Sequence, residues 1–329
     1  MQKTLRSAQF LKDLWADYGL PEPLRWREVS GDTNVTWIVT LKDGQRIVLR
    51  RYHPAFDEPS VRFEQCIVRH LHKNNFPVSG ILSQKNGTHS VHLENHWYAL
   101  LEYKDGRVGL NFFLRKMRPQ LVARAAELLS EFHRLMKTLP RDGEPDFPFT
   151  AGWCLEEIKR LRVFRNPQFN SFLSKAEDWL TQRIALLADS ADLPRTVIHG
   201  DYGPHNLLFK GNQITAVLDF GNAHFNLRVH DVAQGLVSFS KGWGPRLDFS
   251  LARIFLKAYQ NGNRLEKREI SSLPSFMILW NLIPLCHQLG RSQESGSLKN
   301  FRKAVKSMKW VDWLWSRETE MKDFCENLS

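Results

Sequence analysis

The chain has 329 residues, of which 42% are hydrophobic and 25% are charged. This balance is typical of a folded globular protein and excludes wholesale disorder, and the length favours two lobes that share a cleft. The formal net charge of +11 favours anionic partners. The basic residues are nevertheless spread along the chain without a recognisable DNA- or RNA-binding module, so we expect no nucleic-acid partner.

Cysteine usage and hydropathy favour a cytoplasmic protein. The four cysteines are far apart in the sequence and form no CxxC pair, which argues against a disulfide framework and a structural zinc site. The chain contains no run of about 18 uninterrupted apolar residues, so we expect no membrane partner. The first 19 residues lack the pattern of a signal peptide, and their apolar spacing predicts an amphipathic helix.

The first hundred residues favour β-strands. A β-branched run predicts a strand over residues 35–41, and an Asp43-Gly44 turn joins it in a hairpin to a strand over residues 46–50. The spacing of apolar residues predicts a helix over residues 61–74. Two further strands are expected over residues 90–93 and 97–103.

Helical patterns dominate beyond Gly106. We expect helices over residues 121–139, 153–164 and 172–187, and short strands over residues 196–198, 206–209 and 214–218. From Val232 onwards the chain is mostly helical and rich in tryptophan. The sequence therefore predicts an α+β fold with a small β-rich N-lobe over residues 1–103 and a larger α-helical C-lobe over residues 104–329.

The segment HGDYGPHN, residues 199–206, carries the chemistry. Asp201 follows an apolar strand in a loop that contains glycine and proline, and Asn206 opens the next strand. Asp219 ends a later apolar strand, and a hairpin between these strands would bring it beside Asn206. Phosphoryl transfer needs a carboxylate that deprotonates the acceptor hydroxyl and oxygen ligands that hold Mg²⁺ on the phosphates. Asp201 is therefore the candidate catalytic base, and Asn206 and Asp219 are the candidate metal ligands.

Neither half of this pattern is specific by itself. Asp-Phe-Gly alone is a common turn tripeptide, and His-x-Asp alone also fits a metal hydrolase or a capped loop. The HGDxxxxN loop followed by an apolar strand that ends in Asp-Phe-Gly favours a kinase-like site. The HGD loop and the absence of a recognisable activation segment that ends in Ala-Pro-Glu argue against a protein kinase.

These motifs resemble those of the aminoglycoside phosphotransferase/choline kinase superfamily, from about Leu24 to the C-terminal helices. The resemblance implies a bilobal, protein-kinase-like fold, ATP and Mg²⁺ as cofactors, and the roles given above for the base and the metal ligands. It implies that Asp231 braces the catalytic loop, for which a plain helix N-cap is the alternative. His199 would be structural, and we expect His205 to be a solvent or packing histidine rather than a ligand.

Weaker matches concern the N-lobe. Residues 31–34, Gly-Asp-Thr-Asn, resemble the turn that covers the nucleotide phosphates, although by itself this is an ordinary turn. Arg50 stands where the family usually has a phosphate-binding lysine, and Glu64 is its expected helix partner, with a surface glutamate as the alternative. The strand before residue 103 resembles the one that leads into the adenine-binding hinge. The candidate cofactor-binding residues are Gly31, Asn34, Arg50, Glu64, Glu102 and Tyr103.

The resemblance implies an ATP- and Mg²⁺-dependent small-molecule kinase that phosphorylates a hydroxyl. Because aminoglycosides are polycations and the chain is strongly basic, an amino alcohol, a hydroxy amino acid or a sugar is favoured as the acceptor. The segment LRRY, residues 49–52, and the Asp-Phe-Gly region resemble type II homoserine kinases, so a homoserine-like acceptor is a candidate. The alternatives are an aminoglycoside O-phosphotransferase and a non-catalytic nucleotide-binding or interaction member of the same fold.

Overall fold

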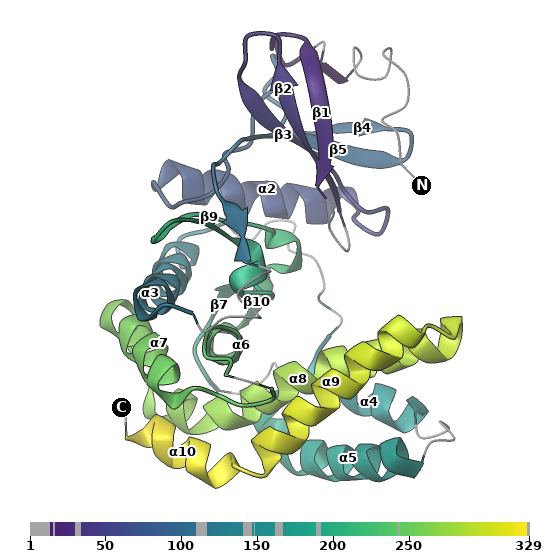
Figure 1. Ribbon diagram of the computed structural model, residues 1–329, viewed down its shortest axis with the longest axis vertical. Helices are drawn as coiled ribbons and strands as arrows, with labels where there is room; N and C mark the ends of the chain where they lie inside the picture. Colours follow the sequence, from purple (N-terminus) through teal and green to yellow (C-terminus); the bar gives the residue numbers. More distant parts are fainter. Residues whose placement is uncertain are drawn as a thin grey trace. The chain divides into compact units, whose positions relative to one another are not determined.

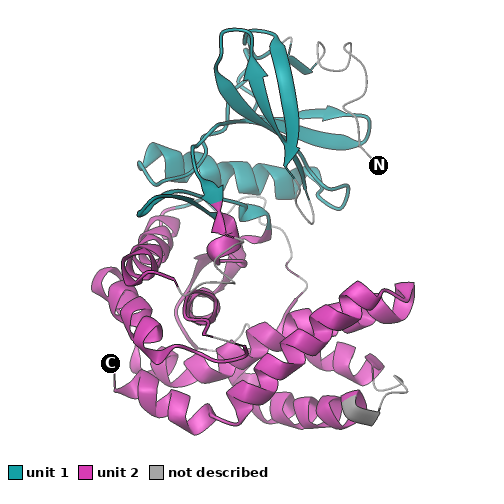
Figure 2. Cartoon of the chain, in the orientation of Figure 1, with its two compact units in different colours: residues 1–107, 139–145, 207–221 teal, residues 108–138, 146–206, 222–329 magenta. Residues whose placement is uncertain are grey.

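The computed structural model of the chain describes residues 14–15, 17–29, 34–109, 117–140, 147, 149–161, 167–188, 192–242 and 244–327. The chain forms two compact units, shown in different colours in Figure 2. Unit 1 comprises Met1–Arg107, Leu139–Pro145 and Leu207–Gly221, and unit 2 comprises Val108–Thr138, Asp146–Asn206 and Asn222–Ser329. Gly31 and most of the predicted N-terminal helix lie outside the described residues.

Unit 1 contains a five-stranded antiparallel sheet with the strand order β1-β2-β3-β5-β4 (Figure 1). The strands are β1 (Pro23–Val29), β2 (Val35–Leu41), β3 (Arg46–Arg51), β4 (Val91–Leu93) and β5 (His96–Glu102). The hairpin predicted at Asp43-Gly44 is confirmed, and its register places Val39 opposite Ile47. Because side chains alternate across a strand, one face of this hairpin is buried in a core with Leu100 of β5.

Helix α2 (Glu58–Lys73) follows the hairpin and begins three residues before the predicted start at Val61. The carboxylate of Asp57 caps the helix, because it accepts a hydrogen bond from the backbone N–H of Ser60 at 3.0 Å, and Pro59 lies in the first turn. Glu64 is buried on the apolar face of this helix. The alternative of a surface glutamate at this position is therefore wrong.

Further strands of unit 1 come from later in the chain. β8 (Leu207–Lys210) and β9 (Gln213–Val217) form an antiparallel hairpin. The two-residue strand β6 (Arg107–Val108), at the boundary of the two units, adjoins β8. The backbone N–H of Val217 donates to the carbonyl oxygen of Pro77 at 2.7 Å. This hydrogen bond ties the hairpin to the segment that follows α2.

Unit 2 is mainly helical, and with the sheet of unit 1 it confirms the predicted α+β fold class. Its helices are α3 (Pro119–Met136), α4 (Ala151–Leu161), α5 (Pro167–Leu187), α6 (Val229–Phe239), α7 (Phe249–Gly262), α8 (Lys267–Ser295), α9 (Leu298–Trp315) and α10 (Glu318–Glu326). Strand β7 (Arg195–Ile198) leads into residues 199–206, the predicted catalytic loop, and pairs antiparallel with β10 (His224–Leu227). The sequence does not predict β10, because two of its four residues, His224 and Asn226, are polar and yet buried.

Helix α8 is long and apolar enough, by length and composition, to cross a membrane. Of its most apolar 18-residue window, however, 72% is buried inside the structure, as in the core helix of a globular protein. Helices α4, α6, α9 and α10 pack against it. In the packing of α4 on α8, the Sγ atoms of Cys154 and Cys286 lie 3.5 Å apart, a contact that their separation in the sequence does not reveal.

Candidate active site

The loop after β7 fixes the carboxylate of Asp201. Its Oδ2 accepts a hydrogen bond from Nδ2 of Asn206 at 3.0 Å and lies 3.1 Å from Nε2 of His205. Its Oδ1 accepts a hydrogen bond from Nε2 of Gln234, in α6, at 3.2 Å. The Asp201 side chain is 34% exposed. The carboxylate is therefore held in one orientation while it stays accessible to a ligand.

The sequence does not predict the contacts of His205 and Gln234 with Asp201. His205 contacts Asp201 directly, because η2 (Pro204–Asn206) turns the chain back toward the aspartate. The spacing of four residues is the one signal in the sequence that could have revealed this contact. Gln234 lies 33 residues beyond Asp201 on a separate helix, and no local pattern connects the two.

Asp231 holds the backbone of the catalytic loop. It is fully buried in the first turn of α6 and accepts hydrogen bonds from the backbone N–H groups of His199 at 2.5 Å and Gly200 at 2.9 Å. Burial raises the pKa of Asp231, but hydrogen bonding and the charge of His133 outweigh this effect and lower the pKa below its usual value. Arg228 is the N-cap of α6, so the bracing role is confirmed and the plain N-cap alternative is wrong.

Buried side chains extend this brace into the core of unit 2. His133, in α3, places Nε2 3.1 Å from Oδ2 of Asp231 and Nδ1 2.8 Å from the hydroxyl of Tyr259 in α7. The backbone N–H of Asp201 donates to Nδ1 of His199 at 3.3 Å, which confirms the predicted structural role of His199. The position of the catalytic loop therefore depends on α3, α6 and α7 together.

Gly200 allows the catalytic loop to approach residue 222. Its φ is +74°, and a Cβ atom at this position would lie 2.3 Å from the carbonyl oxygen of Asn222. We expect Gly200→Ala to displace the loop and to lower kcat by about 100-fold in steady-state assays. Gly211→Ala is the matched control, because Gly211 has a φ of +62° with open space around it. Equal activity of the two variants would contradict the steric argument.

Arg50 is the centre of a second cluster, which lies within unit 1. Its Nη1 donates to Oε1 of Glu64 at 2.6 Å, and its Nη2 donates to Oδ1 of Asp219. Burial disfavours the charged guanidinium, but the two carboxylates outweigh burial, so the pKa of Arg50 is raised above its usual value. The predicted pairing of Arg50 with Glu64 is confirmed.

Loss of the Arg50 charge is expected to destabilise unit 1. Arg50→Met leaves Glu64 buried without its cation, and we expect the free energy of unfolding to fall by about 3–5 kcal/mol. Arg51→Met is the matched control, because the Arg51 guanidinium lies on the other face of β3, 5.6 Å from the Trp37 ring. Urea denaturation measures both variants, and equal midpoints would show that the Arg50–Glu64 pair does not stabilise the fold.

Asp219 has a φ of +62°, a left-handed conformation that aspartate tolerates better than most residues. Its side chain is 44% exposed, and η3 (Phe220–Asn222) follows directly. Carboxylate and amide oxygens are the donors that Mg²⁺ prefers. The hydrogen bonds from Asn206 to Asp201 use the amide nitrogen and leave the amide oxygen available as a ligand for a cation. The side-chain oxygens of Asn206, in unit 2, and of Asp219, in unit 1, are thus of the kind that binds Mg²⁺.

The described residues contain no group of three or more His, Cys, Asp or Glu side chains that could hold a metal ion. A cation bound by a single carboxylate or amide oxygen of the chain must complete its coordination with other oxygen atoms. Phosphate and water supply such ligands in nucleotide-dependent enzymes. Each of the two side chains, within its own unit, therefore fits a metal ion that also takes oxygen ligands from phosphate or water.

The other predicted nucleotide-binding residues have contacts within unit 1. Oδ1 of Asn34 accepts a hydrogen bond from the backbone N–H of His53 at 2.9 Å. The carboxylate of Glu102, at the end of β5, lies 2.8 Å from Nζ of Lys104. The ring of Tyr103 lies 4.0 Å from an arginine guanidinium of β3. The nucleotide-binding roles of these residues stay predictions.

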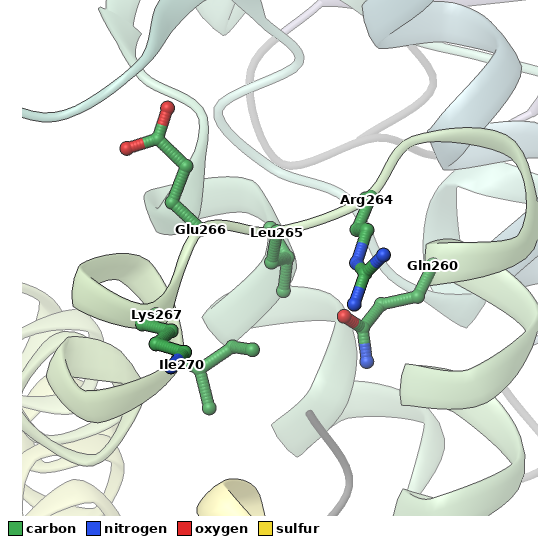
Figure 3. Close-up of a pocket in the computed structure, with 6 residues that line it drawn as sticks. All are labelled: Gln260, Arg264, Leu265, Glu266, Lys267 and Ile270. Atoms are coloured by element: carbon green, nitrogen blue, oxygen red, sulfur yellow. The ribbon is translucent and has the colours of Figure 1, made fainter.

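A surface pocket of about 490 Å³ lies at the junction of α7 and α8 (Figure 3). It is lined by Gln260, Arg264, Leu265, Glu266, Lys267 and Ile270. None of the site residues predicted from the sequence lines this pocket. We therefore assign it no role in catalysis.

A sequence model of the phosphotransferase enzyme family matches residues 25–270. The chain belongs to this family. The match includes the catalytic loop, the Asp-Phe-Gly segment and the sheet of unit 1 from its first strand, and it confirms the predicted superfamily. The phosphotransferase is a small-molecule kinase, as the sequence motifs predict.

Curated relatives of this phosphotransferase include homoserine kinases. The homoserine kinase of Pseudomonas aeruginosa strain PAO1 is 26% identical over 271 residues, which are 81% of each chain. The homoserine kinase of Phenylobacterium zucineum is 24% identical over 275 residues, which are 80% of this chain and 79% of the relative. These matches support the resemblance to homoserine kinases that the sequence analysis identified.

Solved structures show the same fold at lower sequence identity. A microcompartment-associated aminopropanol kinase superposes with a TM-score of 0.74 at 15% identity and covers 96% of this chain and 99% of its own. An amicoumacin kinase in complex with AMP-PNP and Ca²⁺ superposes with a TM-score of 0.71 at 16% identity, with 93% of both chains covered. The phosphotransferase thus has the kinase-like fold predicted from its motifs.

Proposed function

We propose that this phosphotransferase uses ATP and Mg²⁺ to phosphorylate a hydroxyl group of a small metabolite. Its acceptor is an amino alcohol, a hydroxy amino acid of the homoserine type or a sugar. The observation that carries the proposal is the Asp201 carboxylate, which three side chains orient on a loop braced by Asp231. The likeness to homoserine kinases and to an aminopropanol kinase supports this class of acceptor.

In the proposed reaction, the Asp201 carboxylate accepts the proton of the acceptor hydroxyl. The hydroxyl oxygen forms a bond to the γ-phosphorus, the bond from that phosphorus to the bridging oxygen breaks, and the electron pair leaves with ADP. The hydrogen bonds from Asn206 and Gln234 keep the carboxylate aligned, which reduces the entropic cost of reaching the reactive geometry. Bound Mg²⁺ neutralises charge that develops on the phosphates.

The remaining roles follow from the chemistry of the residues. We propose Asn206 and Asp219 as the Mg²⁺ ligands and Arg50 as the cation that contacts phosphate, because arginine stays charged and forms two parallel hydrogen bonds. Nucleotide-binding residues lie in the predicted N-lobe, residues 1–103, and the catalytic and acceptor-binding residues lie in residues 104–329. The wide spacing of the four cysteines, which form no CxxC pair, supports a cytoplasmic location.

Thermal shift and ADP release test the proposal together. MgATP at 100 times its Kd is expected to add about 2.7 kcal/mol of stability. ADP release is then measured with amino alcohols, hydroxy amino acids, sugars and aminoglycosides. Release stimulated by one of the first three classes supports the proposal. Release with aminoglycosides alone favours the antibiotic-modifying alternative, and nucleotide binding without release by any acceptor favours the non-catalytic alternative. A failure of both ATP and GTP to stabilise the chain contradicts the proposal.

A further inference from the structure

Arg228 lies at the junction between β10 and α6. It follows Leu227, the last residue of β10, and is the N-cap of α6. Its backbone N–H donates to the carbonyl oxygen of Pro194 at 3.0 Å, directly before β7. Because an arginine side chain has no acceptor atom, it cannot cap the N–H groups of its own helix. Its donors are therefore available to other elements of unit 2.

The guanidinium of Arg228 is buried and donates to the connection between α7 and α8, part of which Figure 3 shows. Its Nε and Nη2 donate to the two carboxylate oxygens of Glu269, in the first turn of α8, at 2.7 and 2.6 Å. Its Nη1 donates to Oδ1 of Asn263 at 2.5 Å, and its Nη2 also donates to the carbonyl oxygen of Arg264 at 2.9 Å. The start of α6 is thus bonded directly to the start of α8.

The pair of Arg228 and Glu269 is charged and enclosed. Glu269 is fully buried, and burial disfavours the charged guanidinium, but the hydrogen bonds and charge of Glu269 outweigh burial and raise the pKa of Arg228. Two parallel hydrogen bonds fix the angle between the two groups as well as their distance. Neither group can leave the other without exposing a buried charge that has no partner. The pair therefore holds the two helix ends in one geometry.

The first two turns of α6 carry the groups that hold the catalytic loop. Asp231 lies three residues after Arg228 and accepts two backbone N–H groups of that loop. Gln234 lies six residues after Arg228 and donates to the Asp201 carboxylate. At a rise of 1.5 Å per residue, both groups lie within about 9 Å of the N-cap along the helix axis. A shift of the N-cap is therefore transmitted to both.

We propose that Arg228 is a positioning residue for phosphoryl transfer, because its pairing with Glu269 fixes the start of α6 and α6 places the Asp201 carboxylate. This inference rests on the proposed function, in which Asp201 is the base. Arg228 acts through Asp231 and Gln234 and donates no hydrogen bond to Asp201 itself. The 41 residues between Arg228 and Glu269 hide the pair from any local pattern in the sequence.

The first test is the kinetics of the double variant Arg228→Met/Glu269→Gln. Both charges of the pair are removed together, so no buried charge is left without its partner. The glutamine keeps an acceptor for the backbone N–H of Glu266, which donates to Glu269 at 2.8 Å. With the best acceptor, we expect kcat to fall by about 10- to 100-fold, because the catalytic loop is misplaced. KM for MgATP is expected to stay unchanged, because the proposed nucleotide-binding residues lie in the N-lobe.

Arg228→Lys and Arg268→Met accompany the double variant. Lysine keeps the charge beside Glu269 but lacks the planar fork of donors, so we expect its kcat to lie between those of the wild type and the double variant. Arg268 is the matched control, because its side chain is 68% exposed and pairs with Asp192 at the surface, and Arg268→Met is expected to keep the wild-type kcat.

Each variant is assayed below the temperature at which it begins to unfold. A purely structural role of Arg228 would lower the melting temperature and leave kcat of the folded protein unchanged, so a wild-type kcat in the folded double variant would overturn the inference. If the double variant does not fold, Arg228→Lys takes its place, and a wild-type kcat in the lysine variant then has the same meaning.

Hydrogen exchange separates failure of this inference from failure of the proposed function. Backbone exchange is followed by mass spectrometry in residues 195–206, with residues 46–51 of β3 as the internal reference. We expect the double variant to exchange faster only in residues 195–206, because Asp231 no longer holds the loop in place. This result in a chain that releases no ADP would refute the proposed reaction alone. Unchanged exchange in residues 195–206, or equal acceleration in both segments, would overturn the role of Arg228.

Discussion

Asp201→Asn is expected to lower kcat by about 10³-fold, which is within the range for loss of a general base. An amide cannot accept the proton of the acceptor hydroxyl. The substitution also replaces one carboxylate oxygen with an amide NH₂ group, which cannot accept the hydrogen bonds that Asn206 and Gln234 donate to this side chain. The amide NH₂ group of the new asparagine would then face the N–H donor of either Asn206 or Gln234. The orientation of the side chain therefore changes together with its chemistry.

Steady-state kinetics with the best acceptor measures this effect, and thermal shift with MgATP measures nucleotide binding separately. We expect nucleotide stabilisation to persist in the variant, because Asp201 is assigned to the proton and not to the phosphates. Asp192→Asn serves as the control, since the Asp192 side chain is 92% exposed and forms a surface ion pair with Arg268. Full turnover by Asp201→Asn would exclude Asp201 as the catalytic base.

Local patterns predict the elements of this fold, but contacts between distant segments need the structure. The β2–β3 hairpin follows from strand alternation and an Asp-Gly turn, both of which act between neighbours in sequence. The start of α2 is predicted three residues late, because the helix begins at a capping aspartate before its first apolar residue. Strand β10 is missed because its buried polar residues have no hydrophobic period.

The contacts of the candidate site also fall into those that the sequence predicts and those that only the structure shows. The Arg50–Glu64 pair is predicted only through the resemblance to the phosphotransferase superfamily, because strand alternation by itself places Arg50 and Arg51 on opposite faces of β3 without choosing between them. The contact of His133 with Asp231 joins two helices, and that of Gln234 with Asp201 joins a helix to a loop, in each case across a long separation in the sequence. Their donors are common polar residues without a motif, so only the packing of α3 and α6 brings them to the catalytic loop.

Asp231→Asn is expected to cost about 3–5 kcal/mol of stability at neutral pH, because Asp231 is a buried charge whose partners remain in place. The carboxylate accepts two backbone N–H groups and contacts His133. An asparagine has one acceptor oxygen, so the backbone N–H group of His199 or of Gly200 would face the amide NH₂ group instead of an acceptor. Activity is expected to fall as well, because the catalytic loop loses the group that holds its backbone.

The pH dependence of the stability lost in Asp231→Asn shows how much of that loss comes from the charge of Asp231. The pKa of Asp231 is lower in the folded chain than in the unfolded one, so its carboxylate stabilises the fold fully above the ordinary aspartate pKa of about 3.9. This stabilisation is lost as the pH falls through the folded-state pKa. The difference in stability between the wild type and Asp231→Asn should therefore be constant down to about pH 5 and narrow below about pH 4.

Urea denaturation of both proteins across this pH range makes the comparison, with Asp192→Asn as the exposed-carboxylate control. Other carboxylates titrate in the same range, but they are common to both proteins and cancel in the difference. A difference that stays constant at acid pH would show that the ionised form of Asp231 is not what holds the loop. A narrowing difference would instead link the geometry of the proposed base to one buried charge, because the same carboxylate fixes the backbone of His199 and Gly200 next to Asp201.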